Sequence, residues 1–379
     1  MFSPRPNEAT ASGKAQAARR LFPPPNPDLE NLELRFLRVA GRNDVPVAAA
    51  DDIQLDTTPA EPESMSSQLG ATAQVSKGTW KGQRVAIKYI RRDHIGDPYK
   101  RALRQMNHEL QVMSKPSLST HKNITKLLAI CFDHGDPSAV ESPAAAVRPG
   151  LLVELAHEQH PDLRSFFDIG TNPLRPSHLP FGKSASIIAD IADGITALHD
   201  HDIVHADLKP ANILLFADHQ SPGNVIAKIA DFGYIGMSTY NRFGVRASLP
   251  DSRPSGYTAE WSAPECLVHP DYYRETGSLE HASYQPSADI YSFGLLSCYI
   301  ALDGQTPLDY APNLLKSKLS DSLLDLSVAK LKDHYRQAVV GDEGSLEEAA
   351  IRIARDALHL NSKARLQSLR SIRAMLFGT

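Results

Sequence analysis

One short polar loop carries three side chains that could do chemistry together: the carboxylate of Asp207, the ammonium of Lys209 and the amide of Asn212. The three lie between an apolar pair at 203–204 and an apolar run at 213–215. A polar loop between two buried strands is a place where a rigid scaffold can hold reactive groups. This density of polar function between apolar walls makes the loop the first candidate for a reactive site.

Two further motifs accompany this loop, which reads H-x-D-x-x-x-x-N from His205 to Asn212. Asp-Phe-Gly follows at 231–233, and Val-Ala-Ile-Lys precedes the loop at 85–88. Each motif alone is weak evidence, because the first also occurs in small-molecule phosphotransferases. In this order and at these separations, they resemble the catalytic loop, the metal-binding triplet and the third strand of eukaryotic-type protein kinases.

The resemblance implies an α+β fold with two lobes, namely a small N-lobe with an antiparallel β-sheet and one helix, and a larger, mainly helical C-lobe. It also implies ATP and Mg²⁺ as cofactors for phosphoryl transfer, a reaction that needs positioning and charge neutralisation more than covalent chemistry. Asp207 would be the catalytic base that accepts and orients the substrate hydroxyl, and Lys209 would steady the γ-phosphate. Asn212 and Asp231 would bind magnesium, because hard oxygen ligands suit a hard cation.

The strand at 85–88 divides its side chains between two faces. Val85 and Ile87 face one way, whereas Ala86 and Lys88 share the other face. A small residue beside an amine suits a flat base with its phosphates beyond. Taken alone, the strand favours an exposed lysine, but the resemblance implies that Lys88 holds the α- and β-phosphates.

Residues 97–113 should form a helix, because apolar residues recur there at helical spacing. Glu109 flanks the apolar stripe and lies 21 residues after Lys88. A solvated side chain is the usual state of a glutamate. The resemblance and the separation favour instead a catalytic ion pair between Glu109 and Lys88. The apolar positions are Leu103, Met106, Leu110 and Met113.

The expected nucleotide-binding loop departs from the family pattern G-x-G-x-x-G-x-V. Counted back from Val75, the pattern asks for glycines where the chain has Gln68, Gly70 and Ala73. Glycine lets backbone N–H groups approach phosphate without an intervening Cβ, so the glutamine could loosen nucleotide binding. The expected ATP-binding residues are Gly70, Ala73, Val75, Ala86, Lys88, Glu154, Ala156 and Leu214.

A hinge between the lobes is expected at 151–156, which resembles the family's hinge strand. Val153 falls at the gatekeeper position, and the backbone of Glu154 and Ala156 would bond the adenine edge. The preceding residues 134–150 are rich in Pro, Ala and Gly and should form a surface insert.

Two helices should organise the second lobe. Residues 289–294 match the family motif D-x-[WY]-S-x-G and open a stretch that is apolar nearly all round, so this helix should be buried. The resemblance also implies that Arg365 forms a buried, structural pair with Glu265. Ser184 should cap the other helix, which delivers the catalytic loop. The apolar stripe of that helix is Ile187, Ile188, Ile191, Ile195 and Leu198.

The activation segment, 231–265, bears on the acceptor and on regulation. Lys209 and Thr258 are residue types typical of Ser/Thr kinases at these positions. The sequence of 78–88 is closest to that of the tyrosine-kinase-like group of Ser/Thr kinases. Ala206 replaces the arginine that normally pairs with a phosphorylated activation loop, which makes the chain a non-RD type. We therefore expect that phosphorylation of this segment is not the main switch. Its possible phosphoacceptors are Ser238, Thr239, Tyr240, Ser248, Ser252 and Ser255.

Composition narrows the classes of protein further. The 379 residues carry a net charge of −4, which gives no basic footprint for nucleic acid. The longest strongly apolar stretch, around 293–302, is too short to span a bilayer, and the N-terminus lacks the apolar core of a secretory signal. A cytoplasmic location is the default, with a transit peptide in 1–22 as the lesser alternative. The cysteines, expected to be free thiols, are Cys131, Cys266 and Cys298.

The chain should divide into a proline-rich, largely disordered leader at 1–63 and a kinase domain at 64–379. Within the domain we expect the N-lobe at 64–155 and the C-lobe at 156–379. Within the leader, 31–39 could form one half-buried strand, because three apolar residues alternate with charged ones. These residues are Leu32, Leu34 and Phe36.

The prediction is an ATP-dependent serine/threonine-protein kinase that acts in signalling on protein substrates, with no nucleic-acid or membrane partner and an undetermined oligomeric state. The first alternative is a pseudokinase, an ATP-binding or scaffold module, which the poor glycine loop supports. The second alternative is a small-molecule phosphotransferase. The segment 258–265 and the framework of Asp289 with Arg365 disfavour it, because they build a platform for a protein substrate.

Overall fold

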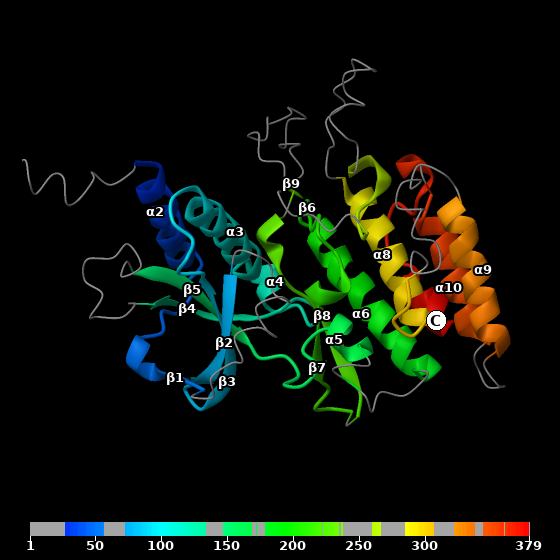
Figure 1. Ribbon diagram of the computed structural model, residues 1–379, viewed down its shortest axis with the longest axis horizontal. Helices are drawn as coiled ribbons and strands as arrows, with labels where there is room; N and C mark the ends of the chain where they lie inside the picture. The colour runs from blue at the N-terminus through cyan, green and yellow to red at the C-terminus, as the bar shows by residue number, and fades with distance from the viewer. Residues whose placement is uncertain are drawn as a thin grey trace, which may run out of the picture.

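The protein folds into two lobes that differ in their secondary structure, as the computed structural model shows (Figure 1). A β-sheet with α2 (Pro27–Arg42) and α3 (Asp97–Met113) forms the first lobe, and helices dominate the second. The predicted two-lobed α+β fold is confirmed, although the first lobe holds more than one helix. The structure describes residues 27–56, 73–133, 147–168, 172, 179–221, 223–234, 236–237, 260–266, 285–306, 322–337, 344–359 and 361–378.

The sheet of the N-lobe is antiparallel, with the described strands in the order β1-β2-β3-β5-β4. β2 and β3 form a hairpin whose two turn residues, Lys81 and Gly82, both have positive φ. Two such residues suit the right-handed twist of the strands. The strands are β1 (Ile53–Leu55), β2 (Ala73–Trp80), β3 (Gln83–Ile90), β4 (Leu127–Asp133) and β5 (Arg148–Glu154).

The predicted helix at 97–113 is confirmed with the same bounds, and its apolar stripe is buried. The short helix α4 (Pro116–Ser119) follows it. The expected insert at 134–150 ends too late, because 148–150 already belong to β5; residues 134–146 lie outside the described residues.

The expectation for the leader is wrong over residues 27–56. Residues 31–39 belong to the helix α2 and not to a strand. Phe36 and Ala40 are buried at helical spacing, whereas Leu34, which alternation placed beside Phe36, is 39% exposed. Beyond α2, the turn η1 (Ala50–Asp52) and β1 complete the lobe. The remaining parts of the leader, 1–26 and 57–63, lie outside the described residues.

Among the described residues, the C-lobe is built around α8, whose side chains are buried on all faces, as expected from its sequence. α6 and α10 pack on α8 (Figure 1). No described helix has the length and apolarity required to cross a membrane. The helices are α5 (Leu163–Phe167), α6 (Phe181–His199), α8 (Pro286–Ala301), α9 (Ser322–Gln337), α10 (Gly344–Ala357) and α11 (Ile372–Phe377).

Two details of this lobe differ from the predictions or refine them. α6 begins at Phe181 with Pro180 at the N-cap, so Ser184 is a buried residue inside the helix and not its cap. The predicted apolar stripe of α6 is buried in full. The three cysteines are free, and Cys131 and Cys298 are buried, whereas Cys266 is partly exposed.

Short elements surround the catalytic loop. β6 pairs with β9, and β7 pairs with β8, in both cases antiparallel. The elements are β6 (Ile203–Val204), η3 (Pro210–Asn212), β7 (Ile213–Ala217), β8 (Val225–Ile229), η4 (Phe232–Tyr234) and β9 (Gly236–Met237), with η5 (Pro264–Cys266) and η8 (Ser362–Ala364) further on.

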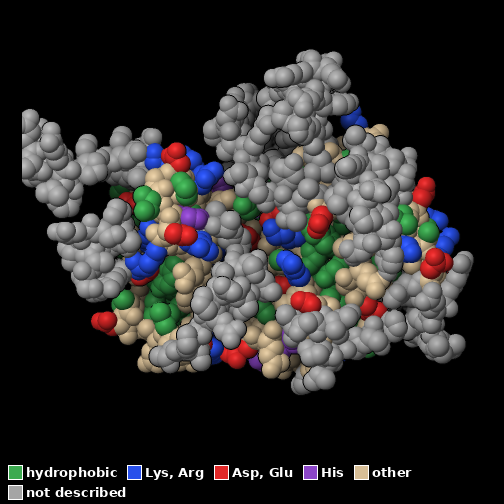
Figure 2. Space-filling view, in the orientation of Figure 1, with side chains coloured by type: hydrophobic (Ala, Val, Ile, Leu, Met, Phe, Trp, Pro, Cys, Tyr) green, Lys and Arg blue, Asp and Glu red, His purple; other side chains and the backbone are tan. Residues whose placement is uncertain are grey.

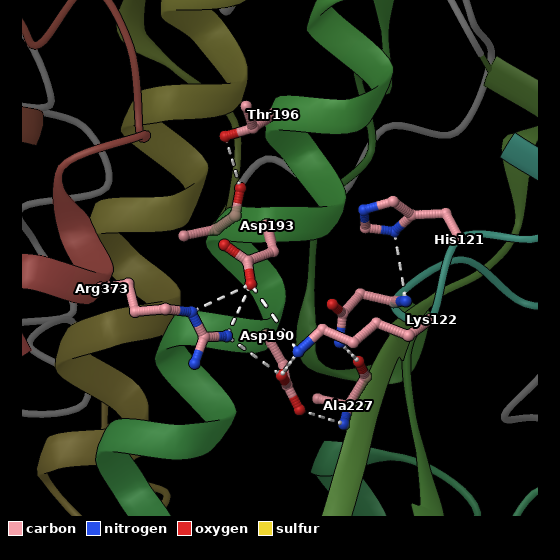
Figure 3. Close-up of polar contacts among 9 residues, drawn as sticks. His121, Lys122, Asp190, Asp193, Thr196, Ala227 and Arg373 are labelled. Carbon is pink, nitrogen blue, oxygen red and sulfur yellow. Dashed lines mark hydrogen bonds and ion pairs between the residues drawn. The ribbon is translucent and has the colours of Figure 1, made fainter. Parts of the chain in front are cut away.

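A network of ion pairs joins the two lobes (Figure 3). Lys122, in the loop before β4, lies 3.4 Å from Asp190 and 3.9 Å from Asp193 of α6. Arg373 of α11 binds the same two carboxylates from the other side, and Asp190 also accepts a hydrogen bond from the backbone N–H of Ala227 in β8. The network therefore ties the N-lobe loop, α6, α11 and β8 together.

Candidate active site

Lys88 of β3 lies between two carboxylates from different parts of the chain. Its Nζ is 2.7 Å from Oε1 of Glu109 in α3 and 3.2 Å from Oδ1 of Asp231. The predicted pair between Lys88 and Glu109 is therefore confirmed. As predicted, Val85 and Ile87 are buried in the sheet's own core, whereas Ala86 and Lys88 face a pocket between the lobes. On the described surface of both lobes, Lys and Arg side chains (blue) and Asp and Glu side chains (red) are interspersed (Figure 2).

Burial and charge together shift the ionisation of this trio. Burial raises the pKa of Glu109 to about 7, although the nearby ammonium of Lys88 opposes this shift. Burial would lower the pKa of Lys88, but Asp231 and Glu109 outweigh it and raise that pKa. Burial would likewise raise the pKa of Asp231, but Lys88 outweighs it and lowers that pKa. Asp231 is therefore held ionised, as a cation ligand must be.

The catalytic loop brings its three polar side chains together. Nζ of Lys209 is 2.7 Å from Oδ2 of Asp207. Nδ2 of Asn212 donates to the backbone oxygen of Asp207 at 2.7 Å and to its Oδ2 at 3.2 Å. Burial raises the pKa of Asp207, and Lys209 opposes that rise. A carboxylate that is 5% exposed and fixed by two neighbours is well placed to accept a proton.

The buried carboxylate of Asp289 in α8 holds the backbone of this loop. It accepts hydrogen bonds from the N–H of His205 at 2.8 Å and of Ala206 at 2.9 Å, and it lies 2.9 Å from Nε2 of His199. Ala206 has φ +66°, a conformation that costs a residue with a Cβ about 1–2 kcal/mol. The helix that the sequence placed in the core thus presents the residue that stabilises this turn.

His205 connects the loop to the segment that carries Asp231. Its Nδ1 accepts the N–H of Asp207 at 3.3 Å, so its Nε2 carries the proton and donates to the carbonyl of Ala230 at 3.0 Å. Its ring also meets Phe232 edge-on, with ring centroids 5.6 Å apart. The histidine of the motif is therefore a structural bridge between the catalytic loop and the Asp-Phe-Gly triplet.

Six of the expected ATP-binding residues line one pocket between the lobes, but Ala73 does not, and Gly70 lies outside the described residues. Glu109, Val153, Asn212 and Asp231 line the same pocket, whereas Asp207 and Lys209 are not among its lining residues. The six are Val75, Ala86, Lys88, Glu154, Ala156 and Leu214.

The pocket has a polar rim that no sequence motif indicated. Lys77 donates to the backbone oxygen of Glu158 at 3.0 Å, and Arg84 donates to the carboxylate of Glu158 at 3.2 Å. Lys77 follows Val75 by two positions in β2, so strand alternation could have placed it on the pocket side. At the hinge, Glu154 binds Lys228 with both carboxylate oxygens at 2.7 Å, a contact that no motif indicated.

Asn212 and Asp231 fit a magnesium ion by their chemistry. The amide nitrogen of Asn212 is bonded to Asp207, which leaves its oxygen as the ligand atom. No cluster of three or more His, Cys, Asp or Glu side chains within the described ranges could hold a metal alone. A cation would therefore rely on amide, carboxylate and nucleotide phosphate oxygens, the usual state of protein-bound magnesium.

Several predicted positions cannot be compared with the structure. The activation segment from 238 to 259, with Thr258 and the possible phosphoacceptors, and the side chain of Glu265 lie outside the described residues. Arg365 is buried as predicted. Its Nε donates to the carbonyl of His359 at 2.7 Å, and its guanidinium lies over the ring of Tyr291. Its pairing with Glu265 stays a prediction.

Comparison with known proteins agrees with this geometry. The family model of the protein kinase domain matches residues 68–377. The chain is 29% identical over 286 residues to calmodulin-binding receptor-like cytoplasmic kinase 1 of Arabidopsis thaliana, covering 74% of this chain and 50% of that protein. It is 24% identical over 267 residues to serine/threonine-protein kinase STY17 of the same plant, covering 70% and 38%.

A third relative is a probable serine/threonine-protein kinase, roco11, of Dictyostelium discoideum, 30% identical over 229 residues that cover 59% of this chain and 12% of that protein. The chain thus spans half or less of the length of these relatives. The family model covers most of the chain, and the matched residues include every motif of the site. The chain therefore belongs to the protein kinase domain family.

Proposed function

We propose that this chain transfers the γ-phosphate of ATP to serine or threonine hydroxyls of protein substrates. The observation that carries the proposal is the contact of Lys88 with Glu109 and Asp231 at the floor of the pocket. Several relatives are named as serine/threonine-protein kinases or probable ones, which supports the choice of serine or threonine as acceptor.

Each residue has a physical task in this proposal. Lys88 neutralises the α- and β-phosphates, and Glu109 keeps its ammonium from swinging away. Asp207 accepts the hydroxyl proton of the substrate, while Lys209, 2.7 Å away, offsets negative charge on the γ-phosphate. Magnesium, held by Asn212 and Asp231 when bound, would supply the remaining charge neutralisation.

The alternatives are less well supported. A pseudokinase is not favoured, because the described site retains every polar group that the reaction needs, with contacts of 2.7–3.2 Å between them. Its only support, the loop at 68–73, lies largely outside the described residues. A small-molecule phosphotransferase is disfavoured because the matched family model extends through the C-lobe.

Labelled ATP and three peptides that differ only in a Ser, Thr or Tyr acceptor test the proposal. We expect magnesium-dependent label on the Ser and Thr peptides and none on the Tyr peptide, with turnover within about 1–100 s⁻¹. Chelation of magnesium and the Asp231→Asn variant should both abolish the label. Label on tyrosine alone, label on a metabolite alone, or ATP binding without transfer would contradict the proposal.

We also propose that phosphorylation of the activation segment is not the main switch of this kinase. Ala206 supplies a methyl group where an arginine would bind a phosphate, and its backbone is already held by Asp289. Phosphatase treatment should therefore leave the turnover within about twofold. Loss of activity on treatment, with recovery by acidic substitutions in the segment, would refute this point. Cytoplasmic location and the absence of nucleic-acid and membrane partners stay predictions from the sequence.

A further inference from the structure

The helix α2 lies along α3 on the outer side of the N-lobe (Figure 1), although it precedes the residues that match the kinase family. Phe36 and Ala40 of α2 are 1% and 3% exposed, and they belong to the same apolar cluster as Leu103 and Leu110 of α3. Removing such a phenylalanine from a core costs about 3–5 kcal/mol in typical proteins. The contact is therefore a core contact, of the kind that fixes the position of a helix.

Hydrogen bonds set the register of the two helices along the whole length of α3. Nδ2 of Asn107, a residue that is 1% exposed, donates to the carbonyl of Leu32 at 3.2 Å. The same Nδ2 also donates to the carbonyl of Leu103 in α3 at 2.9 Å, so one buried amide bridges the two helices. Two more hydrogen bonds lie at the ends of α3. The hydroxyl of Tyr99 donates to Oε1 of Glu33 at 3.1 Å, and Nδ2 of Asn43 donates to Oγ of Ser114 at 2.9 Å.

The chain after α2 anchors it to the sheet. The N–H of Ala48 donates to the carbonyl of Ile130 in β4 at 2.8 Å, and the N–H of Ile130 donates to Pro46 at 2.8 Å. β1 then pairs with β2 at the opposite edge of the sheet. Residues 45–55 thus bind both edges, and α2 is fixed at its C-terminal end.

Another face of α3 makes the contacts of the active site. Glu109 meets Lys88, and Nδ1 of the adjacent His108 lies 3.2 Å from the carbonyl of Gly233 in the Asp-Phe-Gly triplet. A Cβ on Gly233 would lie 3.1 Å from Cβ of Gln105, so α3 also packs closely on this turn. A displacement of α3 by about 1 Å would lengthen both polar contacts beyond hydrogen-bond range.

We propose that α2 is a positioning element of the active site, which holds α3 where Glu109 meets Lys88 and His108 meets Gly233. Phe36 is its principal residue and acts through Glu109, without touching nucleotide or substrate. The functional unit of this kinase then begins near residue 27, about forty residues before the family domain. The inference rests on the proposed kinase function for its activity arm alone.

The activity arm compares Phe36→Ala with Leu37→Ala in the full chain. Leu37 is 47% exposed on the same helix, so its variant controls for a loss of apolar surface and of helix propensity. We expect kcat of Phe36→Ala to fall about tenfold at a temperature where it is folded, and kcat of Leu37→Ala to stay within twofold. Phe36→Leu should restore most of kcat, and Asn43→Ala, which removes one end contact, should show a smaller fall.

A double-mutant cycle with Glu109→Gln separates positioning from general damage. If Phe36 acts through Glu109, the Phe36→Ala change should lower kcat by a clearly smaller factor in the Glu109→Gln background than in the wild type. An equal fold-change in both backgrounds would overturn the proposal. An unchanged kcat for a folded Phe36→Ala variant would overturn it too.

Hydrogen exchange tests the structural claim without any reference to activity. Phe36→Ala should accelerate amide exchange in α3 and η4 and leave exchange in α8 unchanged, whereas Leu37→Ala should change neither. Equal acceleration in α8 would mean global destabilisation and would overturn the proposal. If the wild-type chain transferred no phosphate, the kinase proposal would fail, and exchange would still decide the role of α2.

Discussion

The ammonium of Lys88 lies 2.7 Å from the carboxylate of Glu109, and this contact joins β3 to α3 inside a site where both side chains are largely removed from solvent. Asp231 approaches the same ammonium at 3.2 Å. A cation shared by two carboxylates is poised to exchange one of them for a phosphate. The contact therefore reports whether the site is assembled.

The ionisation of Glu109 makes stability depend on pH. Its pKa of about 7 in the fold lies above the ordinary value of 4.5, so the folded chain binds this proton more tightly than the unfolded chain. The contribution of this group to the unfolding free energy is therefore greatest below pH 4.5 and falls as pH rises towards about 7. Glu109→Gln cannot titrate, so its unfolding free energy should rise relative to the wild type across that interval.

Urea unfolding of both proteins at about pH 5, 6 and 7.5 measures this difference. The amide introduced by Glu109→Gln lacks the charge that binds Lys88, so the variant should also lose at least about tenfold in kcat near neutral pH. A difference in unfolding free energy that stays constant over this range, or that runs the other way, would show that burial does not control this carboxyl.

Asp289→Asn should weaken the catalytic loop. The carboxylate accepts hydrogen bonds from the backbone N–H groups of His205 and Ala206. An amide in its place has only one oxygen, so its NH₂ group would face one of these N–H donors. We expect a loss of about 2–4 kcal/mol in unfolding free energy, together with a lower kcat. Asp200→Asn is the matched control, since its ion pair with Arg370 is exposed and should contribute less than about 1 kcal/mol. Equal stability of the two variants would contradict the assigned role.

Gly294→Ala should destabilise the core of the C-lobe. A Cβ at this position would lie 2.8 Å from Cβ of Ala357 and 2.9 Å from Cδ2 of Leu358, where neither α8 nor α10 can easily yield. Thermal unfolding should show a loss of about 1–3 kcal/mol. Gly182→Ala in α6 meets no atom within 4 Å and should be neutral or slightly stabilising. An unchanged unfolding free energy for Gly294→Ala would contradict this close packing of α8 against Ala357 and Leu358.

The confirmed predictions of helices and contacts rest on a local pattern or on a specific spacing between residues. The stripe of α3 and the buried α8 followed from periodicity, and the pair of Lys88 with Glu109 followed from the family resemblance together with the separation along the chain. The triplet at 231–233 and the loop at 205–212 contact each other through His205, a contact between residues that the motifs had already named.

The wrong or missing predictions concern residues whose structure depends on contacts that are distant along the chain. Leu32, Leu34 and Phe36 fit both a strand and a helix, and the choice depends on α3, which supplies Asn107 from 75 residues away. Ser184 is a good capping residue, but α6 already begins at Phe181, the N–H of Ser184 bonds to the carbonyl of Pro180, and the serine is buried inside the helix. The rim contact of Lys77 with Glu158 likewise joins residues 81 positions apart, which no motif connects.

The chemical role of Asp207 is the central claim, and one comparison tests it most directly. Phosphate transfer to a Ser peptide is measured for the wild type, for Asp207→Asn and for Asp202→Asn. Asp202 is an exposed residue of the preceding turn with φ +57°, a conformation that asparagine tolerates, so its variant should keep full activity. Asp207→Asn should fold normally and lose about 10²–10⁴-fold in kcat. Equal turnover by all three proteins would contradict a catalytic Asp207 and, with it, the proposed mechanism.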